Sequence, residues 1–239
     1  MPGFDTAGRV QSVWPTADRE FGSPRFWIRY FTPSPFATVV NGDPVTECQA
    51  IWNSGGHFLG PTSEPTQSRL DGSATEGRAD AESFVSALTN VYHAVGPLLL
   101  PSSGVLVCFL GQETSTSLSL GYWNGWAGYI NGAEFPPGSG QYPLYAGLYC
   151  NPGSPYPNCS TVGASGAAYC YGIWSSEPEP CGDLANPPAW APEECAAVGT
   201  VLWQYGEQHA CGYIADVDLD EGEPGNDPVN HMFYLDAYP

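Results

Sequence analysis

VLWQYG at residues 201–206, followed one short turn later by ADVDLD at 215–220, decides the fold of this chain. The first run is apolar and typical of a strand, it ends in an aromatic and amide cluster, and an acidic motif comes after it. Two other stretches also carry an apolar run that ends in an acid, GFDT at 3–6 and GVLVCFLGQE at 104–113. Parallel strands of a β/α barrel present their C-terminal ends at one face. The three stretches together therefore predict a barrel mouth lined with carboxylates.

The rest of the sequence predicts strands that alternate with helices. Further strand-like runs are apolar nearly throughout, as expected for strands covered on both faces, and lie at 26–31, 57–60, 144–149 and 168–174. The clearest helix spans 74–94, with acids early and one apolar stripe, and a second is predicted at 116–130 although it contains three glycines. Segments at 151–166 and 175–192 are crowded with Pro, Gly and Cys and indicate long loops. We expect one α/β domain over residues 1–239, a somewhat irregular (β/α)8 TIM-like barrel with these long loops.

The charge of the chain restricts its partners. All six basic residues are arginine, and with 25 acidic residues the formal net charge is -19. This charge repels phosphate groups, which argues against nucleic acid or anionic lipid as a partner. No apolar run approaches the roughly 20 residues that span a bilayer, so we expect no membrane insertion. No basic and apolar leader follows Met1, so a signal peptide is expected to be absent or already removed.

Cysteine usage favours an oxidising compartment. The chain has eight cysteines, six of them in its Gly- and Pro-rich second half, which favours disulfides and an extracellular or cell-envelope location. The local pairings that the spacing suggests are Cys150–Cys159, Cys170–Cys181 and Cys195–Cys211. Reduced, buried cysteine is the alternative. No Cys-x-x-Cys pair occurs and the histidines are scattered, so we expect neither a structural zinc nor a cofactor.

Four acids are the candidate catalytic residues. Asp5 follows the first predicted strand, Glu113 a central one, and Asp216 and Asp218 the last. Cleavage of a glycosidic bond requires one carboxylic acid that protonates the leaving oxygen and a second group that stabilises the oxocarbenium-like centre. Crowded carboxylates raise one another's pKa, which keeps one of them protonated near neutrality. Capping of a turn by Asp5, and of a helix N-terminus by Glu113, are the alternative interpretations.

Four further residues are candidates for substrate binding. Trp203 and Tyr205 offer flat faces for stacking on a sugar and share one face of their strand, whereas Gln204 points to the other face and offers an amide. Core packing is the alternative role for the two rings. Arg29 lies in an apolar strand, where an arginine needs an acidic partner. We expect it to pair with Asp5 and to hold that carboxylate ionised.

These motifs, in this order, resemble the glycoside-hydrolase-like barrel family of unknown function found in bacterial envelope and secreted proteins. That family is similar to the family 25 glycoside hydrolases, lysozymes that cut the muramic-acid linkage of peptidoglycan. By this resemblance Asp5 corresponds to the first-strand aspartate, Glu113 to the catalytic acid, and Asp218 or its neighbour Asp216 to the late aspartate. The lysozymes carry Asp-x-Glu at the central strand, whereas this chain has Gly111 in place of the aspartate.

Three functions follow as hypotheses. The first is a glycoside hydrolase-like protein that acts on peptidoglycan or a related cell-wall polysaccharide through the acids at the mouth. The second is a catalytically inactive glycan-binding barrel, which the glycine at position 111 favours. The third is a structural component of an extracellular assembly with protein partners, which the loops of low charge favour.

Overall fold

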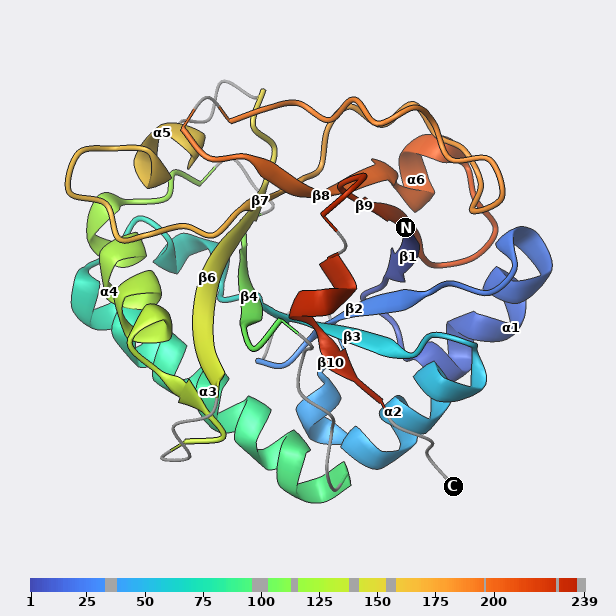
Figure 1. Ribbon diagram of the computed structural model, residues 1–239, viewed down its shortest axis with the longest axis horizontal. Coiled ribbons are helices and arrows are strands. Elements are labelled where there is room, and N and C mark those ends of the chain that lie inside the picture. Colours follow the sequence, from blue (N-terminus) through green and yellow to red (C-terminus); the bar gives the residue numbers. More distant parts are fainter. Residues whose placement is uncertain are drawn as a thin grey trace.

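The computed structural model describes residues 1–32, 38–95, 103–112, 116–137, 142–153, 158–195, 197–226 and 228–235. Figure 1 shows a ring of strands with helices around one part of its circumference and long loops around the other. The outer α-helices are α1 (Val10–Phe21), α2 (Pro44–Asn53), α3 (Ala74–Val95), α4 (Leu120–Asn131) and the short α5 (Asn158–Val162) and α6 (Gln208–Cys211). The smaller elements are η1 (Val40–Gly42), η2 (Gln67–Arg69) and β5 (Glu134–Phe135).

Eight strands within the described residues close the barrel. In the order of the ring they are β1 (Pro2–Asp5), β2 (Phe26–Tyr30), β3 (Phe58–Ser63), β4 (Leu106–Gly111), β6 (Tyr142–Cys150), β7 (Ile173–Ser175), β8 (Thr200–Gly206) and β9 (Asp218–Gly222). Strands β1 to β8 pair in parallel around the ring, whereas β9 is antiparallel to both of its neighbours, β8 and β1.

The closed barrel is therefore mixed, which corrects the prediction of a regular (β/α)8 barrel. The reason lies between residues 206 and 218, where the chain holds only the short helix α6. A parallel return needs a crossover of a dozen or more residues, usually with a helix that spans the barrel. The short connection brings the chain back from the same end, so β9 runs antiparallel.

The C-terminal segment enters the barrel at the end where the parallel strands begin. Here η3 (Pro228–His231) crosses the centre of the view in Figure 1, and β10 (Phe233–Tyr234) follows it. β10 pairs with the start of β3, at Phe58 and Leu59, whereas β4 pairs with β3 only at Thr62 and Ser63. The segment thus fills the gap where β3 and β4 diverge.

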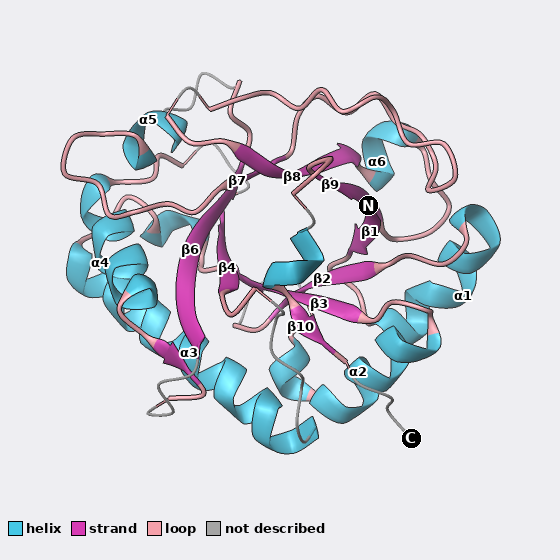
Figure 2. Cartoon of the chain, viewed as in Figure 1, coloured by secondary structure: helices cyan, strands magenta, loops and turns pink. Residues whose placement is uncertain are grey.

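The long helices and the loops cover different parts of the barrel, as Figure 2 shows. α3 agrees with the predicted helix at 74–94. α4 begins at Leu120, later than predicted, because the side chain of Ser119 caps it by accepting a hydrogen bond from the Tyr122 amide.

A Cβ added at Gly125 would collide with the backbone of Ala74, and one at Gly77 with the backbone of Tyr122. These glycines let α3 and α4 approach closely.

Two apolar layers stabilise the ring. Between the strands and the outer elements lies the larger cluster, which includes Phe4, Trp27, Phe84 and Trp123. Inside the barrel lies a smaller cluster to which the C-terminal segment contributes; its buried members are Phe26, Ile28, Val107, Phe109, Trp174, Leu202, Val229 and Met232. The interior is therefore filled with side chains, as in other small barrels.

Two disulfides hold the loop-covered part together. They join Cys159 to Cys195 and Cys181 to Cys211, so the three local pairings predicted from the spacing are wrong. Contact in the fold, and not proximity in sequence, decides the pairing. The four remaining cysteines are buried thiols, Cys48, Cys108, Cys150 and Cys170. The disulfides are consistent with an oxidising compartment. Across the described ranges, no helix combines the length and the apolar character that crossing a bilayer requires.

Candidate active site

The mouth of the barrel, at the C-terminal ends of the parallel strands, carries a hydrogen-bonded chain of polar side chains. Asp5, the last residue of β1, is 3% exposed and accepts a hydrogen bond of 3.2 Å from the Gln204 amide on β8. Gln204 accepts in turn a 2.8 Å hydrogen bond from the Tyr149 hydroxyl on β6. Asp5 and Gln204, predicted from opposite ends of the sequence, are thus brought into contact.

A second carboxyl group, that of Asp220, meets Asp5 inside the barrel. In the antiparallel pairing of β1 with β9, Asp5 lies opposite Asp218, and Gly3 opposite Asp220, so the three aspartates share one face. The ring of Phe26 packs over Gly3, and the Asp220 side chain accepts a 2.9 Å hydrogen bond from the Trp174 indole. The carboxyl groups of Asp220 and Asp5 lie within hydrogen-bonding reach of each other.

Burial decides the charge of this pair. Asp220 is completely buried, and no donor among the described residues reaches its Oδ2. Loss of solvation raises the pKa of the Asp220 carboxyl well above its usual value, and the carboxylate of Asp218 adds to the rise. The hydrogen bonds that Asp220 makes with Asp5 and with the Trp174 indole oppose this rise. Burial nevertheless dominates, so this pair takes up a proton more readily than an isolated aspartate does.

Further acids continue the array toward the loop that follows β7. Burial raises the pKa of Asp218 to about 6, with Glu207 and Asp216 contributing, while a 2.7 Å hydrogen bond from the Gln208 amide opposes the rise. Burial also raises the pKa of Glu179 to about 7, helped by the charges of Glu177, Glu207 and Asp218. The mouth therefore contains carboxyl groups that change protonation near neutral pH.

Glu64 adds a carboxyl group from the end of β3. Its side chain is buried and packs over Gly111, at the end of β4, where an added Cβ would lie 3.3 Å from the Glu64 Cγ. Since Ser63 pairs with Leu110, residues 64 and 111 are neighbours at the rim. The Glu64 side chain from the end of β3 thus takes the space beside Gly111 on β4, where no side chain is present.

Two of the four predicted catalytic acids are not among the buried acids described above. Glu113, the predicted general acid, lies outside the described residues. Asp216 is exposed at the rim, where its backbone carbonyl accepts a 2.6 Å hydrogen bond from the Thr6 hydroxyl. Of the predicted acids, Asp5 and Asp218 are therefore the ones that the structure places side by side.

Arg29 does not pair with Asp5, which corrects the prediction. It points away from the barrel interior, is completely buried, and forms an ion pair of 2.7 Å with Glu47 on α2. Its guanidinium also donates to the backbone carbonyls of Thr6, Gly8 and Thr38. The period-two alternation of β2 explains the difference, because Ile28 occupies the inner face and its neighbour must face outward. Arg29 therefore organises the loop after β1 and does not reach the mouth.

Trp203 and Tyr205 also face outward, while Gln204 faces inward, as the alternation predicts. The two rings are 1% and 0% exposed and pack in the outer apolar layer under the loop that follows β7. The Trp203 indole donates a 2.8 Å hydrogen bond to the Pro178 carbonyl of that loop. Stacking on a sugar stays a prediction that requires this loop to uncover them.

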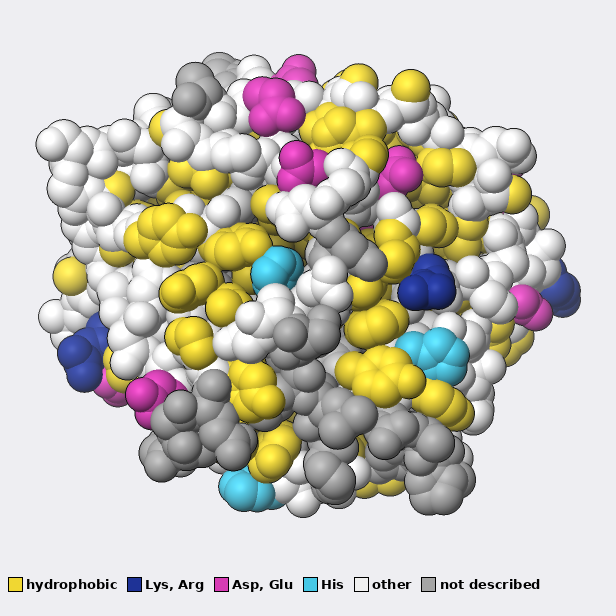
Figure 3. Space-filling model, in the orientation of Figure 1, with side chains coloured by type: hydrophobic (Ala, Val, Ile, Leu, Met, Phe, Trp, Pro, Cys, Tyr) yellow, Lys and Arg dark blue, Asp and Glu magenta, His cyan; other side chains and the backbone are white. Residues whose placement is uncertain are grey.

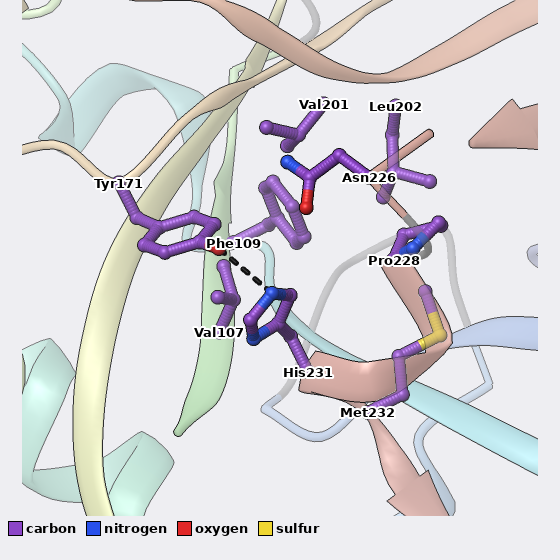
Figure 4. A pocket seen from close by; sticks show the side chains of 9 residues that line it. All are labelled: Val107, Phe109, Tyr171, Val201, Leu202, Asn226, Pro228, His231 and Met232. Carbon is purple, nitrogen blue, oxygen red and sulfur yellow. Dashed lines mark hydrogen bonds between the residues drawn. The ribbon is translucent and has the colours of Figure 1, made fainter. Parts of the chain in front are cut away.

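Among the residues that the structure describes, the opposite end of the barrel has no comparable array of carboxyl groups. Figure 4 shows an apolar hollow there, in which the Tyr171 hydroxyl and His231 Nε2 lie 2.7 Å apart. His231 Nδ1 lies 2.9 Å from the Ser103 hydroxyl, so these contacts fasten η3 to the barrel. Figure 3, which views this end, shows many hydrophobic side chains around the centre and acidic ones in a few patches. The acids at the other end are therefore the better candidate site.

The sequence did not predict three acids of the mouth as site residues, namely Asp220, Glu64 and Glu179. The alternation of DVDLD does indicate that Asp218 and Asp220 share a face, and this signal was available. Glu64 and Glu179 follow strands directly or closely but lie in Pro-containing segments without a local pattern. No group of three or more potential ligand residues within the described ranges is arranged to hold a metal ion.

Comparisons with known proteins bear on the fold. No protein family matches the sequence, and no curated protein does. The crystal structure of an uncharacterized protein from B. stearothermophilus is similar with a TM-score of 0.72 and 19% identity, over 97% of this chain and 99% of that one. The Clostridium perfringens spore cortex lytic enzyme SleM is similar with a TM-score of 0.55 and 13% identity, over 95% of this chain and 68% of that one. At these identities the likeness is one of fold alone.

Proposed function

We propose that this protein is a glycoside hydrolase that acts on bacterial cell-wall glycan at the mouth of its barrel, in an extracellular or envelope compartment. The observation that carries the proposal is the array of carboxyl groups at this mouth, in which Asp5, Asp218 and Asp220 share one face and burial raises the pKa of both Asp218 and Asp220. The fold likeness to a spore cortex lytic enzyme supports the choice of cell-wall glycan.

The proposed roles follow from the position of each acid. Asp5, which accepts hydrogen bonds in the interior, stabilises the positive charge that develops on the sugar ring. Asp220 and Gln204 orient Asp5, and Asp218 holds the sugar next to it. Glu113 is the general acid that the family resemblance implies.

Glu179 is a second candidate for the general acid. A pKa of about 7 leaves about half of its carboxyl groups protonated at neutral pH, as a general acid for a leaving oxygen requires. It lies close enough to Asp218 for their charges to interact. The two candidates are separated by comparing Glu113→Gln with Glu179→Gln.

The test is release of reducing ends from purified peptidoglycan by the wild type and by three variants, Asp5→Asn, Glu113→Gln and Glu179→Gln. Loss of the general acid is expected to lower the rate by about 10²–10⁴-fold. Glu194→Gln, an exposed substitution in the loop between β7 and β8, is the matched control and keeps the wild-type rate. No release by the wild type, or undiminished release by all three variants, contradicts the proposal.

Binding of glycan without cleavage is the second candidate function. Gly111 favours it, because β4 lacks a side chain where the lysozymes carry an aspartate. Retention of the wild type on insoluble peptidoglycan without turnover supports this alternative, and failure to bind excludes both functions.

A further inference from the structure

A second polar pocket lies beside the mouth, on the outer side of the ends of β2 and β3. Its volume is about 320 Å³, and it is bounded by Thr32, by Ser63 and by the first half of α3, which contributes Asp80 and Ser83. The chain between Ser63 and Pro65 separates it from the mouth, because those two residues line the pocket while Glu64 packs against Gly111 on the other side. A ligand that lies across this strand end therefore reaches both sites.

The groups in the pocket are fixed and carry no net charge. Arg69 donates two hydrogen bonds, of 2.9 and 3.0 Å, to the two carboxylate oxygens of Asp80, and the Tyr122 hydroxyl donates a third of 2.7 Å to Asp80. The hydroxyl groups of Thr32 and Ser63 lie 3.0 Å apart. The bidentate geometry holds the guanidinium plane in place. The pocket thus presents preorganised donors and acceptors.

This chemistry selects the class of ligand. An anion gains little from Arg69, because Asp80 already neutralises it, and the net charge of -19 repels anions. A cation finds a single carboxylate, which is already engaged by two donors. A neutral ligand with many hydroxyl groups matches groups that both donate and accept. The volume lies at the small end of the range for ligand sites, which suits a single sugar ring.

We propose that this pocket binds one pyranose ring of a glycan whose neighbouring part occupies the acidic mouth. The inference rests on the proposed function and extends it, since it assigns a subsite outside the barrel that lengthens the recognised segment of the chain. Its members are the Arg69–Asp80 pair, the hydroxyl groups of Thr32 and Ser63, and the rim residues Thr66 and Ser83.

The test fills the pocket without removing any of its hydrogen bonds. Ser83 is exposed on α3 and lines the pocket, so Ser83→Trp places a large ring in it. Thr66→Trp does the same from the opposite rim. Asn90→Trp is the matched control, because Asn90 is exposed on the same helix, seven residues or about 10 Å further along, and does not line the pocket.

Binding is measured by titration calorimetry with the hexasaccharide of N-acetylglucosamine and with solubilised peptidoglycan strands. Ser83→Trp and Thr66→Trp are expected to raise the Kd by about tenfold or more, which corresponds to loss of one sugar contact. Asn90→Trp is expected to bind within about twofold of the wild type. Circular dichroism melting confirms that each variant is folded.

The outcomes separate the two proposals. If the wild type binds these glycans and both pocket variants bind equally well, the pocket is not a subsite, while the proposed function stands. If the wild type binds neither glycan, the proposed function fails and the sugar assignment of the pocket fails with it. If Asn90→Trp raises the Kd as much as Ser83→Trp does, the subsite proposal is also contradicted, because the effect then does not depend on the pocket.

Discussion

The buried ion pair between Arg29 and Glu47 gives the sharpest test of how the mouth is supported. Arg29→Met leaves the Glu47 carboxylate buried without its cation, which costs about 3–5 kcal/mol. Three backbone carbonyls lose a donor as well, at about 1 kcal/mol each. The expected loss of about 6–8 kcal/mol is comparable with the entire free energy of unfolding of a typical domain, about 5–15 kcal/mol.

Two milder substitutions test whether Glu47 or Asp5 is the partner of Arg29, because they are expected to change the free energy of unfolding differently. Glu47→Gln preserves shape but removes the charge that Arg29 requires, so we expect a loss of about 2–4 kcal/mol. Asp5→Asn removes a carboxyl group that lies against that of Asp220, and Asn retains an acceptor oxygen. It is expected to change stability by less than about 1 kcal/mol or to raise it.

The assay is urea unfolding at pH 7 followed by tryptophan fluorescence, with the same slope required of all variants so that stabilities compare. If Asp5→Asn costs more than Glu47→Gln, Arg29 is paired with the mouth after all, and the reasoning from strand alternation is refuted.

Three further predictions concern packing, the disulfides and pH. Gly125→Ala is expected to cost about 3 kcal/mol or more because its Cβ meets the Ala74 backbone, whereas Gly128→Ala, with open space around it, gains up to about 1 kcal/mol; thermal melts compare the two. Replacing Cys181 and Cys211 together by Ser is expected to lower stability by about 3 kcal/mol in urea, since the bond closes a loop with a sequence separation of 30. The pKa of Asp218 is about 6 in the folded protein and about 3.9 in the unfolded chain. The stabilisation of the folded state by the protonated Asp218 carboxyl group is therefore fully present below pH 4 and is lost as the pH rises through 6. Asp218→Asn is therefore expected to raise stability by about 3 kcal/mol at pH 7 and not at pH 4, and an equal gain at both pH values contradicts the assigned pKa.

Much of the fold was predictable because the local signals agree with it. The apolar runs that end in acids became barrel strands, and the stripe over 74–94 became α3. The direction of β9 was not predictable from the run itself, because an apolar strand reads the same in a parallel or an antiparallel pair. Only the short connection before β9 indicates that it is antiparallel. The central glycines of α4 suggested a weak helix, because the sequence alone does not show that another helix packs closely against them.

For the site, sequence placed Asp5, Asp218 and Gln204 at the mouth but could not assign partners. Arg29 illustrates the limit, since strand alternation sets the face on which it lies, while its partner Glu47 comes from a helix 18 residues away. Asp220 reaches Asp5 because β9 pairs with β1, which joins the two ends of the barrel sequence. Such pairings are properties of the closed ring and leave no trace in any local segment.

The position of β9 has a consequence for how the chain is made. β1 pairs with β2 on one side and with β9 on the other, so one edge of β1 remains open during synthesis until residues 218–222 have emerged. A nascent chain that has been made up to the end of β8 therefore presents two unpaired edges, those of β1 and β8, and such edges invite association with other chains. Ring closure therefore requires a pairing between Pro2 and Glu221, and pairings so distant in sequence are of the kind that slows folding.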